Sequence, residues 1–188
     1  MSKSRKVRAG ATAARTRKSG HGGAASGLAD AVTYPAAAPT GESTHFVAEA
    51  SQLYHVDPQA RIALIREGVP ASSIGELSTH MGISKENLLA SLGLSRATIN
   101  RKERSATPLS RDESERVLGV GMLIGMVHAM VQQSGDPAGF DAARWVAGWL
   151  ASPVPALAGA TPASYMDTIE GQRLVAELLA RTQSGVYA

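Results

Sequence analysis

The sequence of 188 residues predicts an all-α fold, and three observations support this prediction. No window alternates Val, Ile or Thr with polar residues over a sustained stretch, which is the pattern of a half-buried strand. Signals for helix starts recur instead along the chain. The apolar content of 44% is enough for a core, and because aromatic residues make up only 4%, that core must be mainly aliphatic.

Short helices joined by tight turns are predicted over residues 45–108, which we expect to form one region. Ser, Thr and Asp favour helix N-caps because their side-chain oxygens accept hydrogen bonds from free backbone amides, and Pro is tolerated at the first helical position. A capping box adds a Glu three residues later. The predicted starts are Asp57 with Pro58, the capping box of Ser73 and Glu76, Ser84 and Ser95.

A second helical unit is predicted over residues 109–188. Its first helix is long and ends near Gln133, because Gly, Asp and Pro follow at positions 135–137. The next helix covers "AGFDAARWVAGWLA" and is followed by the irregular connector "SPVPALAGATP". The other predicted signals are a capping box of Ser110 and Glu113, a short helix capped by Thr161 and Pro162, a last helix from about Glu170 to Gln183, and a C-terminal cap at Gly185.

The apolar run "VLGVGMLIGMVHAMV" from Val117 to Val131 raises the alternative of a membrane span. It is shorter than the 18 or more apolar residues typical of a spanning helix, and His128 interrupts it. We therefore expect a buried core helix, and no membrane partner.

Residues 1–44 are predicted to form a disordered basic arm. Seven basic residues lie before Ser19 and no acid precedes Asp30, so the remainder of the chain is net acidic although the whole chain carries +3. The arm is rich in Ala, Gly, Ser and Thr and lacks helical or strand periodicity. A solvated tail, an organellar transit peptide and an arm attracted to nucleic-acid phosphates are the alternatives. The absence of cysteine excludes disulfides and fits a reducing compartment.

The segment "SKENLLASLGLSRATINRKE" from Ser84 to Glu103 predicts a helix-turn-helix. Two short helices flank a turn at Leu92-Gly93-Leu94, where glycine can take the positive φ of a sharp bend. In this motif the second helix enters the major groove of DNA. The side chains expected to pack the two helices together are Leu88, Leu89, Leu92 and Ile99.

The second helix of this motif carries the candidate DNA-binding residues. Arg pairs with guanine and Asn with adenine, while Lys and Thr suit phosphate oxygens. The competing interpretation is the solvated face of an ordinary helical hairpin. Because a lone helix-turn-helix grips DNA weakly, we expect a homodimer. The predicted outward-facing, DNA-binding residues are Arg96, Thr98, Asn100, Arg101, Lys102 and Arg104.

The sequence predicts no catalytic or metal site and no cofactor. Five histidines are scattered, none has the spacing of a metal pair, and there is no cysteine to complete a zinc site. His128 is expected to be partly buried in an apolar helix. The glycines of "GVGMLIG" follow no strand and precede no Gly-Lys-Ser/Thr, so a phosphate-binding loop is not expected. An enzyme is the least supported class of function.

Residues from about Leu94 to the C-terminus resemble the MbcA/ParS/Xre antitoxins, which pair with RES-domain toxins. The resemblance rests on the order and spacing of several stretches. In the connector, Pro155 and Ala158 stand where the family has Asn and a second Gly. The stretches that carry it are "LGLSRATINRK", "LSRDESERVL", "FDAARWVAGWL", "PALAGATP" and "IEGQRLVAELLARTQSGVYA".

The resemblance implies a type II antitoxin of the bacterial cytoplasm that has no enzymatic activity. Its Xre-like region would bind operator DNA as a homodimer and repress its own operon. Its C-terminal region would obstruct the active site of an NAD-degrading RES toxin within a hetero-oligomer. The alternative is a stand-alone helix-turn-helix regulator whose C-terminal domain only dimerises or senses a ligand. The toxin-binding residues implied are Leu174, Leu178, Arg181, Gly185, Val186, Tyr187 and Ala188.

The residues alone leave two places open for the apolar tip that follows the last helix. Val186 and Tyr187 suit insertion into a partner's cleft, since aromatic anchors in desolvated pockets often dominate interface energy. They equally suit packing back onto the antitoxin's own last helix. The family resemblance favours the cleft.

Overall fold

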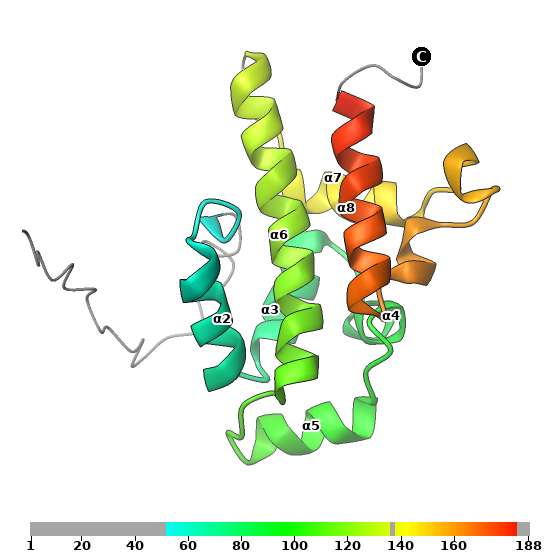
Figure 1. Cartoon of the computed structure of the whole chain (residues 1–188). Coiled ribbons are helices and arrows are strands. Elements are labelled where there is room, and N and C mark those ends of the chain that lie inside the picture. The colour runs from blue at the N-terminus through cyan, green and yellow to red at the C-terminus, as the bar shows by residue number, and fades with distance from the viewer. Residues whose placement is uncertain (1–51, 136–137, 184–188) are drawn as a thin grey trace, which may run out of the picture. The chain divides into compact units, whose positions relative to one another are not determined.

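The computed structural model describes residues 52–135 and 138–183, and the predicted all-α fold is confirmed for them (Figure 1). This part of the chain contains helices and turns but no strand. The helices are α2 (Pro58–Glu67), α3 (Ser73–Met81), α4 (Lys85–Ser91), α5 (Arg96–Arg104), α6 (Arg111–Ser134), α7 (Ala142–Ala151) and α8 (Ile169–Gln183), with two 3-10 turns, η1 (Pro155–Leu157) and η2 (Pro162–Tyr165).

Four of the predicted helix starts are confirmed. The Asp57 carboxylate accepts hydrogen bonds from the first backbone amides of α2, and proline takes the first helical position. Ser84 and Ser95 cap α4 and α5 in the same way. At α6 the full capping box is present, because Ser110 Oγ accepts from the Glu113 amide at 3.3 Å and the Glu113 carboxylate accepts from the Ser110 amide at 2.7 Å.

One predicted cap is wrong, and another is confirmed only in part. Ser73 is buried as the first residue of α3, the N-cap is Ser72 without a side-chain bond, and the Ser73 amide donates to the Pro70 carbonyl instead. Glu76 Oε2 is buried and has no hydrogen-bond partner among the described residues. Thr161 is the N-cap of a short helix as predicted, but the helix is of the 3-10 type and the Thr161 side chain makes no capping bond. At the start of α3, the amides that a cap would serve are already satisfied, because those of Gly75 and Glu76 donate to the Ser72 carbonyl.

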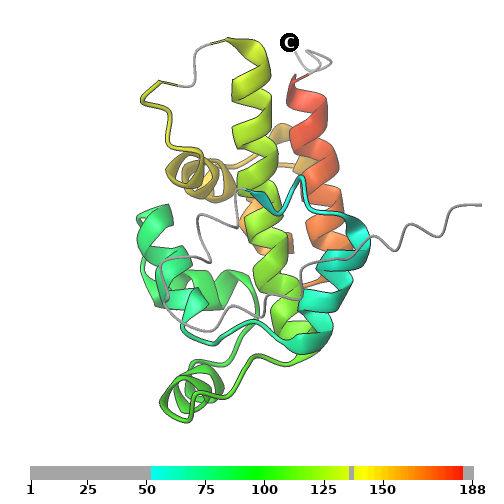
Figure 2. The same cartoon turned by 90° about the vertical axis from the view of Figure 1, so that its left-hand side faces the viewer.

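Helix α6 is the central element of the described chain (Figures 1 and 2). It packs against α2, α7 and α8, while α5 crosses beside its N-terminal end. Its buried side chains join one continuous apolar core that extends from Leu53 to Leu179. The helix-turn-helix region and the C-terminal helices therefore share α6. The buried residues of α6 are Ser114, Val117, Leu118, Val120, Gly121, Leu123, Ile124, Gly125, Val127 and Ala129.

By length and composition alone, α6 could cross a membrane. Half of its most apolar stretch is buried against the other helices, which is the environment of a core helix. His128 is half-buried and its Nε2 lies 3.0 Å from the Gln132 amide nitrogen, as expected for a partly buried histidine that serves packing.

The predicted division of the chain at residues 44 and 108 stays a prediction. The basic arm of residues 1–44 lies outside the described residues, as does Gly185 with its predicted cap. At the second boundary, Leu109 donates its amide to the Val69 carbonyl at 2.8 Å, and Val69 donates to Ser114 Oγ at 3.0 Å. These hydrogen bonds connect the start of α6 to the loop before α3.

The connector between α7 and α8 contains a residue in the left-handed region. Ala158 has φ +53°, and it stands where the resembling family carries a glycine. A left-handed conformation costs an L-residue with a Cβ roughly 1–2 kcal/mol, whereas glycine adopts it readily. The connector therefore keeps the turn that a glycine would make, at some cost in stability.

Ala158→Gly is expected to raise the free energy of unfolding by roughly 0.5–1 kcal/mol, since relief of strain exceeds the added freedom of the unfolded chain. Urea denaturation of the full chain measures the change. Ala156→Gly is the matched control, because Ala156 is also exposed but lies within η1 at negative φ, and it should lower stability. Equal effects of the two changes would contradict the assignment of strain to Ala158.

Candidate nucleic-acid interface and C-terminal apolar surface

Helices α4 and α5 form the predicted helix-turn-helix. Gly93 has φ +61° in the turn between them, and α5 begins three residues later at Arg96. The Lys85 ammonium links the two helices, lying 2.6 Å from the Glu103 carboxylate and 3.2 Å from Asn100 Oδ1. The predicted packing residues are all buried, namely Leu88, Leu89, Leu92 and Ile99.

The exposed side of α5 is basic. The Arg96 side chain is 68% exposed and lies 3.3 Å from the Glu86 carboxylate, a surface pair that water and salt weaken. Arg101 and Arg104 are exposed, while Thr98 and Asn100 are half-buried. At about 100° per residue, Arg96, Asn100, Arg104 and Arg101 fall within an arc of about 140°. One side of α5 thus presents three guanidinium groups and an amide.

Asn100 already accepts one hydrogen bond, from Lys85. Pairing with adenine uses the amide as both donor and acceptor, and the acceptor oxygen already binds the Lys85 ammonium. The amide oxygen has two lone pairs, so it can accept from a base while it binds Lys85, which also pairs with Glu103.

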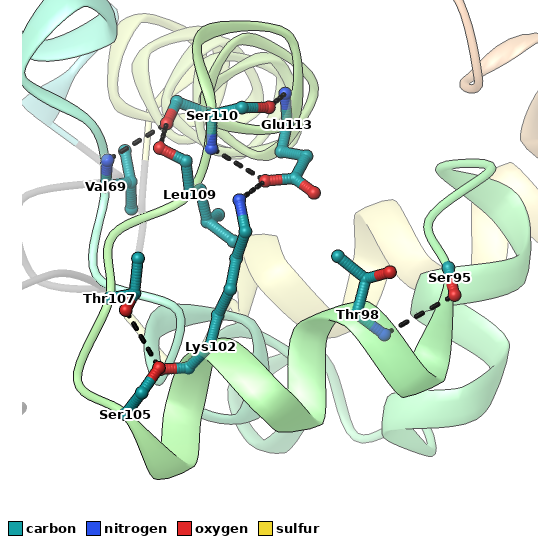
Figure 3. Close-up of polar contacts among 10 residues, drawn as sticks. Val69, Ser95, Thr98, Lys102, Ser105, Thr107, Leu109, Ser110 and Glu113 are labelled. Carbon is teal, nitrogen blue, oxygen red and sulfur yellow. Dashed lines mark hydrogen bonds and ion pairs between the residues drawn. The ribbon is translucent and has the colours of Figure 1, made fainter.

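Lys102 does not face outward, which corrects the sequence prediction of its orientation. Its ammonium contacts the Glu113 carboxylate at the start of α6, and both side chains are only 16% exposed (Figure 3). Burial raises the pKa of Glu113, but hydrogen bonds from Lys102 and Ser110 outweigh it and hold this pKa below its ordinary value. Lys102 and Glu113 therefore join α5 to α6. The part of Lys102 in DNA binding stays a prediction.

The C-terminal helices carry an apolar surface with two hollows. Trp145 is 40% exposed and stacks on the half-buried Trp149, with ring centroids 6.2 Å apart and planes 9° apart. One hollow of about 250 Å³ is lined by Val127, Met130, Val131, Ser134, Phe140, Trp145 and Leu179. The other, of about 390 Å³, is lined by Trp149, Ser152, Pro153, Val154, Pro155, Ala156 and Leu178.

The predicted toxin-binding residues differ in their exposure. Leu174 is 38% exposed and Arg181 is exposed near Glu177, whereas Leu178 is buried and reaches the surface only as a wall of the larger hollow. Gly185, Val186, Tyr187 and Ala188 lie outside the described residues. Leu174 and Arg181 are thus the predicted residues on the accessible face of α8.

Sequence analysis missed the tryptophan pair as an exposed feature. Trp145 and Trp149 are four residues apart, so one face of α7 holds both, and they are the only tryptophans in an aromatic-poor chain. That spacing was the signal from which an aromatic pair on α7 could have been predicted. Among residues 52–135 and 138–183, no group of three or more His, Cys, Asp or Glu side chains could hold a metal ion.

The fold and this surface define a helix-turn-helix protein with an appended helical unit that exposes aromatic side chains. Residues 60–120 match the antitoxin Xre-like helix-turn-helix domain, and residues 138–185 match the antitoxin Xre/MbcA/ParS C-terminal toxin-binding domain. The first match ends within α6, and the second begins shortly before α7.

Two relatives are similar over most of their length. The "Prs ADP-ribosylating antitoxin" of Sphingobium sp. (strain YBL2) is 41% identical over 136 residues, which is 72% of this chain and 86% of the relative. The "Antitoxin Xre" of Photorhabdus laumondii subsp. laumondii is 27% identical over 126 residues, 67% of this chain and 80% of the relative. The chain therefore belongs to the Xre/MbcA/ParS antitoxin family. It is an antitoxin with a helix-turn-helix and a toxin partner, rather than a stand-alone regulator.

Proposed function

We propose that this antitoxin neutralises a RES-domain toxin that consumes NAD, by obstructing the toxin's active site with its C-terminal region. The observation that carries the proposal is the apolar surface of α7 and α8 within the residues that match a toxin-binding domain. Exposed aromatic side chains beside apolar hollows are typical of binding surfaces, since their burial against a partner dominates interface energy.

The name of the Sphingobium relative supports NAD as the toxin's substrate. That name refers to ADP-ribosylation, a transfer for which NAD supplies the ADP-ribose group. A toxin of this kind consumes NAD whether it transfers the group to a protein or to water. The proposed antitoxin only has to keep NAD out of the toxin's cleft, so it acts by binding and needs neither a cofactor nor a catalytic group.

The residues proposed to contact the toxin form the accessible face of α8 and the tip beyond it. Leu174 offers an apolar side chain, and the Arg181 guanidinium suits a carboxylate of the toxin. Val186 and Tyr187 follow the end of α8 after two residues, and an aromatic ring there suits a narrow cleft. Leu178 contributes through the wall of the larger hollow.

The helix-turn-helix is proposed to repress the antitoxin's own operon. Arg96, Arg101 and Arg104 are exposed on α5 and supply the charge that attracts phosphates and guanine edges. A single such helix contacts a short site, so a homodimer that reads two half-sites explains a specific operator better. We propose that the antitoxin acts in the bacterial cytoplasm, because operator DNA and NAD are both found there.

Co-expression with the RES-domain protein encoded beside the antitoxin tests the proposal. The toxin alone should arrest growth and lower cellular NAD, and the antitoxin should restore both and copurify with it. Incubation of lysate with labelled NAD separates hydrolysis from transfer, because only transfer labels protein. A toxin that arrests growth at constant NAD would contradict the proposed substrate, and failure to copurify would contradict the proposed mode of neutralisation.

A further inference from the structure

The turn of the helix-turn-helix is held by a residue outside the motif. Arg116, in the second turn of α6, donates through Nη1 to the Leu92 carbonyl at 3.0 Å and lies 3.4 Å from the Gly93 carbonyl. Carbonyls at the end of a helix lack partners within it, and a cation there also complements the helix dipole. Arg116 thus caps the C-terminal end of α4 from the side.

The backbone of Arg116 also contacts α8. The Gln172 side-chain nitrogen donates to the Arg116 carbonyl at 3.0 Å and to the Met166 carbonyl at 2.9 Å. Gln172 is 8% exposed, and both hydrogens of its amide group are used. A buried amide with satisfied donors has one favourable orientation, because any other orientation leaves polar atoms unpaired.

The Gln172 amide fits in this position because residue 119 is a glycine. A Cβ at Gly119 would lie 1.8 Å from Gln172 Oε1 and 2.7 Å from its Cδ, so any side chain there displaces the amide. The turn itself also approaches the C-terminal unit closely, since a Cβ at Gly93 would lie 3.1 Å from the Asp167 Cβ. Two glycines therefore allow α8 and the segment before it to contact α6 and the turn.

We propose that Arg116 and Gln172 are positioning residues for DNA recognition, through which α8 fixes the turn from which α5 projects. This inference rests on the proposed role of α5 in operator binding. Because α5 begins three residues after Gly93, a shift of the turn moves Arg96 and the whole exposed arc of α5. Specific contacts need their geometry, whereas charge attraction to phosphates tolerates such a shift. Loss of the network therefore lowers specificity for the operator.

The test compares variants of the full chain for binding to the operator and to a scrambled duplex at several salt concentrations. Arg116→Ala should lower operator affinity roughly tenfold, with little change on the scrambled duplex or in the salt slope. Gly119→Ala, which removes no charge, should have the same effect. The matched controls are Arg144→Ala, an exposed arginine paired with Asp141, and Gly148→Ala, where a Cβ meets no described atom within 4 Å.

Arg116→Lys separates positioning from a direct phosphate contact. Lysine keeps the charge but lacks the guanidinium whose Nη1 contacts both carbonyls, so it restores binding if Arg116 contacts phosphate and fails to restore it if Arg116 holds the turn. Equal losses on both duplexes, with a salt slope lower by about one, would also assign Arg116 to phosphate and overturn the proposal. Retained toxin binding and an unchanged circular dichroism spectrum show that a variant is folded.

The two proposals fail in different ways. Wild-type protein that binds no operator removes the proposed role of α5, and the positioning role falls with it. Wild-type protein that binds the operator, with folded Arg116→Ala and Arg116→Lys variants at unchanged affinity, overturns the positioning role alone. A Gly119→Ala variant that does not fold leaves this decision to the two Arg116 variants.

Discussion

An antitoxin in which Arg96 and Arg101 are both changed to alanine is expected to lose operator binding while it still neutralises the toxin. Both guanidinium groups are on the exposed side of α5, at the end of the described chain opposite the C-terminal end of α8 (Figure 1). Each lost base or phosphate contact costs roughly 1–3 kcal/mol. Two such losses lower operator affinity by roughly thirtyfold or more, because each 1.4 kcal/mol is a factor of about ten.

Electrophoretic mobility shift and a reporter fused to the antitoxin's own promoter measure this loss. The control carries Arg66→Ala and Arg144→Ala, which removes the same charge from exposed positions on α2 and α7. It should reduce only the non-specific, salt-dependent part of binding. If the Arg96 and Arg101 variant binds the operator as tightly as the wild type, α5 is not the recognition helix.

Removal of Gly185 to Ala188, or Tyr187→Ala, is expected to weaken neutralisation and to leave operator binding nearly unchanged. These residues follow α8, and the apolar core of the described residues extends from Leu53 to Leu179, so we expect it to survive their loss. A buried aromatic anchor contributes about 2 kcal/mol or more at an interface, which is roughly thirtyfold in affinity. NAD consumption by the toxin at saturating antitoxin, beside a pull-down, measures both obstruction and binding.

Two further variants make this result specific to the tip. Tyr187→Phe keeps the ring and should retain most of the inhibition, whereas Leu174→Ala removes an exposed side chain of α8 and should weaken the pull-down instead. Full inhibition by the truncated antitoxin would show that the tip does not block the cleft. The face of α8 or a change in the toxin's own structure would then account for neutralisation.

Local sequence signals predicted most of the helices. They failed where a turn just before the helix already supplied acceptors for the backbone amides that a capping side chain would bind. The pattern of Ser followed three residues later by Glu occurs at Ser110 and at Ser73, but only Ser110 leads a helix with free amides. Ser73 follows a backbone turn, in which its amide donates a hydrogen bond to the Pro70 carbonyl. The two segments look alike in sequence, so the difference is visible only once the backbone before each helix is known.

The helix-turn-helix was predicted correctly because its determinants are local, whereas the partners of α5 were not. Leucines at helical spacing and a glycine in the turn define the motif within about twenty residues. Lys102 looked like its neighbours because nothing near it in sequence marks Glu113 as a partner across the next turn. The Gln172 amide pairs with a carbonyl 56 residues away, a contact that a single sequence does not indicate.

Because α6 belongs to both halves, exchange of toxin specificity between related antitoxins has a natural limit. A recombinant joined at residue 108 would combine a foreign α6 with a native turn, and a recombinant joined after α6 would combine a native Gly119 with a foreign α8. In the second recombinant, the glycine and the glutamine that occupies its space come from different parents, and in the first, the residue at 116 and the Leu92–Gly93 turn that it contacts do so. Functional hybrids are therefore expected when α6, the connector and α8 come from one parent. The helix-turn-helix from the other parent must then have a turn at residues 92–93 whose carbonyls can accept hydrogen bonds from Arg116.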